Sequence, residues 1–153
     1  SQKAVILFND NHDKLWDITL DELKKVAGDN PNFKDTEKKI AGFKNSYGTI
    51  LFYTDTNETQ KLIDNFPAYA DNFPLWAHQE NGMLQFAVWT ALADENVGAS
   101  LQHYNPLIDD KVKESFNIPN SWKLLSQMPF GDIDNPVNAQ EKYPIEEKLI
   151  IKK

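Results

Sequence analysis

The sequence has 153 residues, a formal net charge of −7 and no cysteine. A chain of this length suits one domain that buries roughly 70% of the surface exposed on unfolding, so its core needs no disulfide or metal. The missing cysteines exclude a disulfide scaffold, a zinc–cysteine site and a cysteine nucleophile. The acidic charge argues against a nucleic-acid surface or an anionic membrane surface, and no segment resembles a membrane span or a secretion signal. We therefore expect a soluble, cytoplasmic protein whose partners are small molecules.

The first third of the chain predicts strands and helices in the order strand, helix, helix, strand. The apolar run Lys3–Phe8 predicts a buried strand. The stretch Asp13–Ala27 repeats its apolar residues at helical spacing, and Gly28 supplies the stop that ends a helix. A second helix is predicted over Asp35–Asn45 and a second strand over Gly48–Thr54.

The middle of the chain predicts two helices of different character. Residues 57–66 predict a short capped helix, which Pro67 interrupts. In the helix predicted over Pro74–Asp94, the apolar residues surround the axis instead of forming one stripe. A helix of this type is buried on all sides. It lies either in the middle of a domain or at a subunit interface, and composition alone leaves both open.

The last third predicts three more pieces of regular structure. Val97–Tyr104 predicts a third strand, Pro106–Phe116 a short helix and Ser121–Met128 a fourth strand. After a polar arm, Lys148–Lys152 predicts an apolar strand whose backbone groups must find a partner. That partner is either the edge of its own sheet or the sheet of a second subunit. Together the elements predict one α+β domain over residues 1–153.

Few of the side chains form a catalytic pattern by themselves. The histidines at positions 12, 78 and 103 lack metal-ligand spacing, and we expect no metal site. The sequence has no nucleophile elbow, phosphate-binding glycine loop or dinucleotide fingerprint, so redox chemistry would need a bound cofactor. The run Gly98–Pro106 is the most informative, because a strand that enters a sharp Asn-Pro turn exposes backbone N–H groups. A buried strand with a polar end is the simpler interpretation of the same run.

Five ordered motifs carry a resemblance to a known family. They are Tyr69–Pro74, Ala87–Ala93, Gly98–Asp109, Ile118–Lys123 and Gln127–Gly131. In this order they resemble the FMN-dependent nitroreductase family, in the bacterial and fungal branch that includes fatty-acid-repression-type proteins. The resemblance implies an α+β homodimer with a mixed sheet flanked by helices, a buried central helix at the interface and a C-terminal strand exchanged with the partner. It also implies two interfacial FMN sites and the reduction of nitroaromatics or quinones with NAD(P)H by alternating hydride transfers.

Carried over residue by residue, the resemblance implies contacts along the whole cofactor. The segment whose backbone lies along the isoalloxazine ring, with an N–H near the flavin N5, is matched by Ser100, Leu101, Gln102 and His103. Lys3 matches a basic residue at the pyrimidine edge, and Lys142 matches a late basic residue that contacts the FMN phosphate. Without the family, both lysines would be interpreted as solvent-exposed side chains.

The resemblance also leaves two questions open. Tyr69, Phe73 and Trp76 are predicted to form an aromatic wall over the flavin that stacks flat substrates, with core packing as the alternative. Family members open with a helix that bears an Arg-Arg-Ser phosphate motif and then an Asn-Ser-Gln segment, whereas this sequence begins after both and has no Arg. We therefore expect it to be part of a longer protein, the alternative being a weakened FMN site. The alternative function is a non-catalytic ligand-binding dimer with the same fold.

Overall fold

A computed structural model describes residues 1–135, 138–139 and 141–152. Its four strands form one sheet in the order β1-β2-β4-β3. The strand bounds are Gln2–Phe8 for β1, Gly48–Asp55 for β2, Gly98–Ala99 for β3 and Trp122–Gly131 for β4. All neighbouring pairs are antiparallel, so the predicted mixture of strand directions is not found among these four strands.

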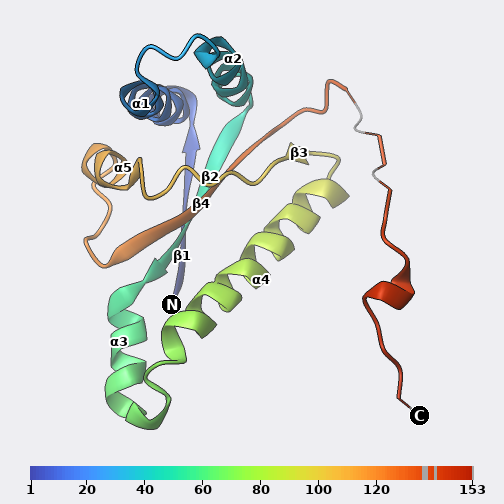
Figure 1. Cartoon of the computed structure of the whole chain (residues 1–153). Helices are drawn as coiled ribbons and strands as arrows, with labels where there is room; N and C mark the ends of the chain where they lie inside the picture. The colour runs from blue at the N-terminus through green and yellow to red at the C-terminus, as the bar shows by residue number, and fades with distance from the viewer. Residues whose placement is uncertain (136–137, 140, 153) are drawn as a thin grey trace.

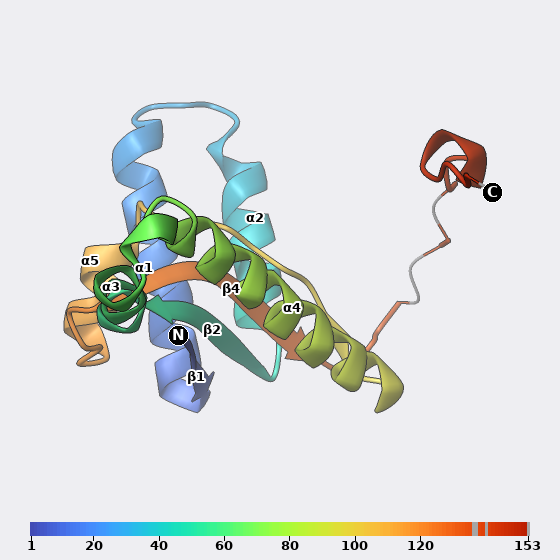
Figure 2. The same ribbon diagram turned by 90° about the horizontal axis from the view of Figure 1, so that it is seen from below.

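Helices cover both faces of this sheet (Figures 1 and 2). One face carries α1 (Asn9–Ala27), α2 (Phe33–Lys44) and α5 (Asp109–Ser115). The other face carries α4 (Phe73–Asp94), which contacts β1, β2 and β3. A short helix, α3 (Thr56–Asn65), and a 3-10 turn over 67–69 lead from β2 into α4. The α+β class is confirmed, with five α-helices in the described part of the chain.

Local sequence explains where α1 begins and ends. It begins at Asn9, four residues before the predicted start, because Asn9 takes a positive φ of 51° and turns the chain directly from β1 into the helix. It ends as predicted at Gly28, which has a φ of 55°. No linker therefore separates β1 from α1, and the helix returns across the face that it covers.

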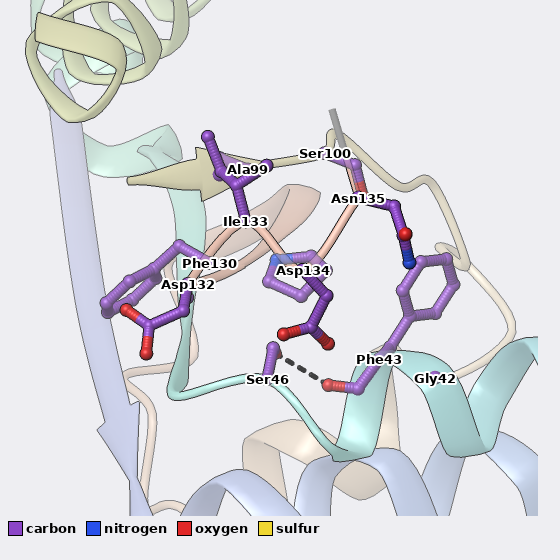
Figure 3. Close-up of a pocket in the computed structure, with 13 residues that line it drawn as sticks. Gly42, Phe43, Ser46, Ala99, Ser100, Phe130, Asp132, Ile133, Asp134 and Asn135 are labelled. Carbon is purple, nitrogen blue, oxygen red and sulfur yellow. Dashed lines mark hydrogen bonds between the residues drawn. The ribbon is translucent and has the colours of Figure 1, made fainter. Parts of the chain in front are cut away.

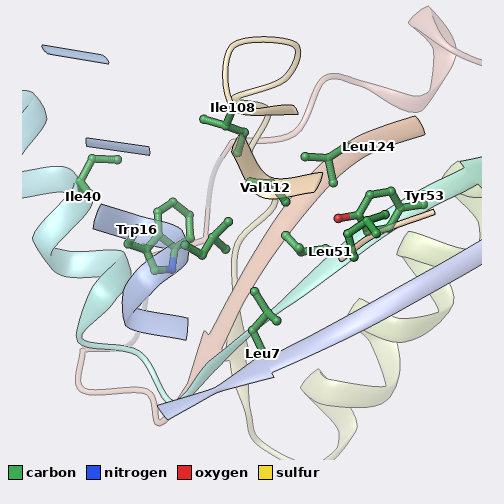
Figure 4. Packing of buried hydrophobic residues seen from close by; sticks show 10 residues of the cluster. Leu7, Trp16, Ile40, Leu51, Tyr53, Ile108, Val112 and Leu124 are labelled. Atoms are coloured by element: carbon green, nitrogen blue, oxygen red, sulfur yellow. The ribbon is translucent and has the colours of Figure 1, made fainter. Parts of the chain in front are cut away.

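The core lies mainly between the sheet and the helices α1, α2 and α5 (Figure 4). Alternate residues of β2 point to opposite faces, so Leu51 and Tyr53 join this larger core whereas Ile50 and Phe52 face α4. Every residue of β2 is buried, as expected of a central strand. The larger core is completed by Leu7, Leu15, Trp16, Ile40, Ile108, Val112, Ile118 and Leu124.

The prediction that α4 is buried on all sides is wrong for the single chain. Of its 22 residues only Ala77 and Asn81 are buried. The helix packs one side against the sheet and leaves the opposite apolar side in solvent, which excludes a position in the middle of the domain. The large exposed apolar side chains of α4 are Leu75, Trp76, Met83, Phe86 and Trp89.

Two strand predictions also need correction. The third strand is much shorter than the predicted Val97–Tyr104, because after Gly98–Ala99 only an isolated bridge at Gln102 continues the pairing. The fourth strand runs on through Pro129 to Gly131. Pro129 is tolerated because its nitrogen and carbonyl both face the short β3 side, where its carbonyl accepts the Ser100 N–H, so no bond to β2 is lost.

The C-terminal segment does not form the predicted strand in this chain. Residues 148–152 are irregular and follow a 3-10 turn over Ile145–Glu147. They lie clear of the sheet in both views (Figures 1 and 2), and Leu149, Ile150 and Ile151 are exposed. Pairing with the edge of its own sheet is therefore wrong, whereas exchange with a partner remains a prediction.

Across the described residues, no helix has the length and apolarity to cross a membrane.

Candidate functional site

The segment that follows β3 presents free backbone donors at an open sheet edge. The Ser100 N–H donates to the Pro129 carbonyl at 3.2 Å, and the Gln102 N–H donates to the Gln127 carbonyl at 2.7 Å. Successive N–H groups of an extended chain point in opposite directions. The N–H groups of Leu101 and His103 therefore point away from β4, and neither donates to any other group in the part of the chain that the structure describes.

The side chains of this segment lie on different sides. Leu101 packs with the small cluster under α4, beside Ala99. Gln102 donates from Nε2 to Ser100 Oγ at 3.1 Å, while the His103 side chain is exposed. The segment thus offers the open edge two backbone donors and one solvent-facing imidazole.

A pocket of about 740 Å³ adjoins the beginning of this edge (Figure 3). Phe43 and Phe130 contribute aromatic surface, and Asp132 and Asp134 line the pocket as well. Ser46 donates from Oγ to the Phe43 carbonyl at 2.7 Å and so closes the end of α2 beneath it. A space of this size with mostly apolar walls suits a flat organic ring. The remaining lining residues are Gly42, Gly98, Ala99, Ser100, Pro129, Gly131, Ile133 and Asn135.

Only part of the predicted site is brought together in one chain. Ser100 lines the pocket, and Leu101, Gln102 and His103 continue from it along the edge. Lys3 lies on β1, the opposite edge strand, with its Nζ 6.0 Å from the centre of the Trp122 ring. Lys142 is exposed on the arm after β4.

The predicted aromatic wall forms a cluster of its own. The ring centres of Tyr69 and Trp76 are 6.1 Å apart, and those of Phe73 and Trp76 are 5.3 Å apart. The cluster lies at the first turns of α4, whereas the last turns of α4 lead into β3. With a rise of 1.5 Å per residue, the two ends of this helix are roughly 30 Å apart. A single chain therefore cannot place the wall over the edge segment.

No role was predicted for Gln127 beyond its place in a family motif, although the structure places it at the base of this edge. It is fully buried on β4, and its Oε1 accepts the Tyr104 N–H at 2.8 Å. The sequence did contain a signal for this role: Gln127 is a polar residue within a predicted apolar strand, and a buried polar side chain must find hydrogen-bond partners.

A second, smaller pocket of about 150 Å³ lies under α5. Within the described residues, Tyr53 Oη and Asp109 Oδ1 are buried there without a hydrogen-bond partner. Burial raises the pKa of Tyr53, and the nearby carboxylate of Asp109 raises it further. Burial also raises the pKa of Asp109, with an additional contribution from Asp110. This pocket is therefore an unfavourable polar environment on the face of the sheet that α1, α2 and α5 cover.

The fold and the edge segment define an α+β protein with a candidate ligand site at an open sheet edge. Comparisons with known sequences and structures identify its family. The model of the nitroreductase family matches residues 1–132. Nitroreductase FRM2 of Saccharomyces cerevisiae is 34% identical over 129 residues, which are 84% of this chain and 62% of FRM2. The chain therefore spans about three fifths of the length of that curated relative. It belongs to the nitroreductase family, and the resemblance predicted from its motifs is confirmed.

Solved structures agree with the family assignment. Nitroreductase CinD from Lactococcus lactis, in complex with nicotinic acid, is 42% identical with a TM-score of 0.91, covering 100% of this chain and 78% of CinD. The FMN-dependent nitroreductase NfnB from Mycobacterium smegmatis, in complex with NADPH, has a TM-score of 0.70 over 99% of this chain and 79% of its own. NfnB is only 11% identical, so that likeness shows the fold alone.

Proposed function

We propose that this chain is an FMN-dependent NAD(P)H oxidoreductase, cytoplasmic and homodimeric, that reduces nitroaromatic or quinone-type acceptors by alternating hydride transfer. One observation carries the proposal: the N–H groups of Leu101 and His103 face an open edge and have no partner among the described residues, next to a pocket with room for a flat ring. Unpartnered backbone donors cost free energy unless a ligand or solvent accepts from them. An acceptor-rich flavin edge meets that requirement.

The ring end of FMN fits the edge segment. Backbone N–H groups aimed at the flavin N5 stabilise the reduced ring, because electron density increases there on reduction. Leu101 and His103 would supply these donors, while Ser100 and Gln102 hold the segment against β4. Bound FMN would supply two-electron transfer between the nicotinamide and the acceptor. No side chain is assigned as a proton donor, and solvent serves that role.

The phosphate and pyrimidine ends of FMN are assigned to lysines. An ammonium group is an effective partner for a phosphate oxygen. Lys142 on the arm would contact the phosphate, and Lys3 the pyrimidine edge. In one chain these lysines lie apart from the edge segment, so the proposal requires a second copy to bring the parts together.

The exposed side of α4 supports the homodimer. Its five large apolar side chains form a solvent-facing stripe that a second copy of α4 would cover. The same pairing would carry Tyr69, Phe73 and Trp76 of one copy towards the edge segment of the other, where they would form the aromatic wall. The strand Lys148–Lys152 would then be exchanged with the partner's sheet.

Relatives support the choice of substrates. CinD has been solved with nicotinic acid and with 4-nitrophenol. Flat aromatic acceptors of this type match a wall built from aromatic rings.

The test is a spectrum and a turnover assay of the full-length protein. We expect purified protein to show the visible absorption of bound flavin, and to oxidise NADH or NADPH when 4-nitrophenol or a quinone is added. Colourless protein that does not take up added FMN would refute the proposal. Protein that binds FMN and transfers no hydride would instead be a non-catalytic flavin-binding dimer.

A further inference from the structure

Gln127 joins β4 to the edge segment through both its backbone and its side chain. Its backbone N–H donates to the Gln102 carbonyl at 2.9 Å and its carbonyl accepts the Gln102 N–H at 2.7 Å. On the side chain, Oε1 accepts the Tyr104 N–H at 2.8 Å, and Nε2 donates to Asn105 Oδ1 at 3.4 Å. The residue has no exposed surface, so water does not compete for these bonds.

These contacts hold His103 from both sides. The preceding residue, Gln102, is fixed by its paired backbone bonds, and the following residue, Tyr104, is fixed by the Gln127 amide. The free N–H of His103 therefore has its direction set by two anchors. Leu101 also lies between two anchored residues, but both of its neighbours are held by the backbone of β4 and do not need the Gln127 side chain.

We propose that Gln127 is a positioning residue that aims the His103 N–H at the reduced flavin, an inference that rests on the proposed function. A donor aimed at a position where charge increases on reduction favours the reduced state over the oxidised state. Gln127 does not touch the cofactor. It acts by keeping Tyr104, and through it His103, in a single conformation.

The test is Gln127→Met, which keeps the length of the side chain and removes both polar atoms. In the full-length protein we expect FMN to remain bound, and the affinity for reduced FMN to fall about tenfold relative to oxidised FMN. That ratio lowers the midpoint potential by about 30 mV for a two-electron couple. The Tyr104 amide should also exchange its hydrogen faster in flavin-free protein.

Ser126→Ala is the matched control. Ser126 is the adjacent residue of β4, is equally buried, and has an Oγ without a hydrogen-bond partner in the described chain. We expect its midpoint potential to equal that of the unmodified protein. A purely structural role for Gln127 would weaken the binding of both flavin redox states equally and leave the potential unchanged, and this result would overturn the inference.

A second variant covers the case in which Gln127→Met does not fold. Asn105→Ala releases the amide from its other end, and we expect a smaller shift of the potential in the same direction; no shift would contradict the inference. Failure of the unmodified protein to bind FMN would refute the proposed function itself, whereas bound FMN with an unchanged potential in the variants would refute only the role of Gln127.

Discussion

The two faces of the sheet are completed in different ways. The face under α1, α2 and α5 is closed by side chains of the same chain. The face under α4 has a small cluster centred on Ile50, Phe52 and Met128, and beyond it the outer side of α4 is apolar and exposed. One face therefore forms a closed core within the chain, whereas the other is left open on the side where the proposed second copy and the proposed flavin site would lie.

The largest effect is expected on the open face. Phe86 on α4 is 73% exposed, and Phe86→Glu would place a charge in the proposed interface between copies. Burying an unpaired charge costs on the order of 3 kcal/mol, or about a hundredfold in affinity. We expect sedimentation to show monomers at concentrations where the parent is dimeric, with FMN binding lost as well.

Val26→Glu is the control for this variant, because Val26 is 72% exposed but lies on α1, over the closed face. It should leave the mass and the FMN affinity unchanged. If the Phe86→Glu protein kept both properties too, the two faces would not differ in the proposed way.

On the closed face, a smaller effect is expected at a buried hydrogen-bonded group. Thr49 Oγ1 accepts from Trp16 Nε1 at 3.0 Å and donates to His12 Nδ1 at 2.9 Å, while His12 Nε2 donates to the Lys44 carbonyl at 3.0 Å. Because a carbonyl oxygen only accepts, the His12 Nε2 carries a proton. Thr49→Val leaves two buried nitrogens without partners, at a cost of about 2–4 kcal/mol in the free energy of unfolding.

Urea denaturation measures that cost, and Thr54→Val is the matched variant on the same strand. Thr54 is also buried, but among the described residues its hydroxyl makes only a 3.4 Å contact with Ser1 Oγ. We expect it to lose less than about 1 kcal/mol. Equal losses for the two variants would show that the group around His12 does not determine the stability of the closed face.

The closed face was also the more predictable one from sequence. The buried strand Gly48–Thr54 and the helix Asp13–Ala27 have patterns that match their final positions, because their apolar residues pack within the chain. For Pro74–Asp94 the pattern predicted a helix correctly but could not distinguish burial by the domain from burial by a partner. Residue spacing describes one chain, and the covering surface of α4 lies outside it.

The candidate site was predictable only in part for a related reason. The motif Gly98–Asp109 identified the edge segment, but the segment is held by Gln127, a residue far along the sequence whose side chain accepts the Tyr104 N–H. Hydrogen bonds between distant residues leave no trace in local periodicity. The positions of Lys3 and Lys142 relative to the edge depend on how two copies assemble, and that too is absent from spacing.

The smallest effect is expected at the polar pocket under α5, where Asp109 Oδ1 and Tyr53 Oη have no hydrogen-bond partner within the described residues. The pKa of Asp109 in the folded protein lies above its ordinary value of 3.8, so the folded protein holds this proton to higher pH than the unfolded chain does. The stability contributed by this group is therefore present below that value and is lost as the pH rises through the raised pKa. Asp109→Asn removes this loss, so we expect its melting temperature to match the parent in acid and to exceed it slightly at neutral pH. Tyr53→Phe is the control, because it removes the neighbouring uncharged hydroxyl and should raise the stability equally at both pH values. If Asp109→Asn also raised the stability equally at both pH values, burial would not be raising the pKa of the Asp109 carboxylate.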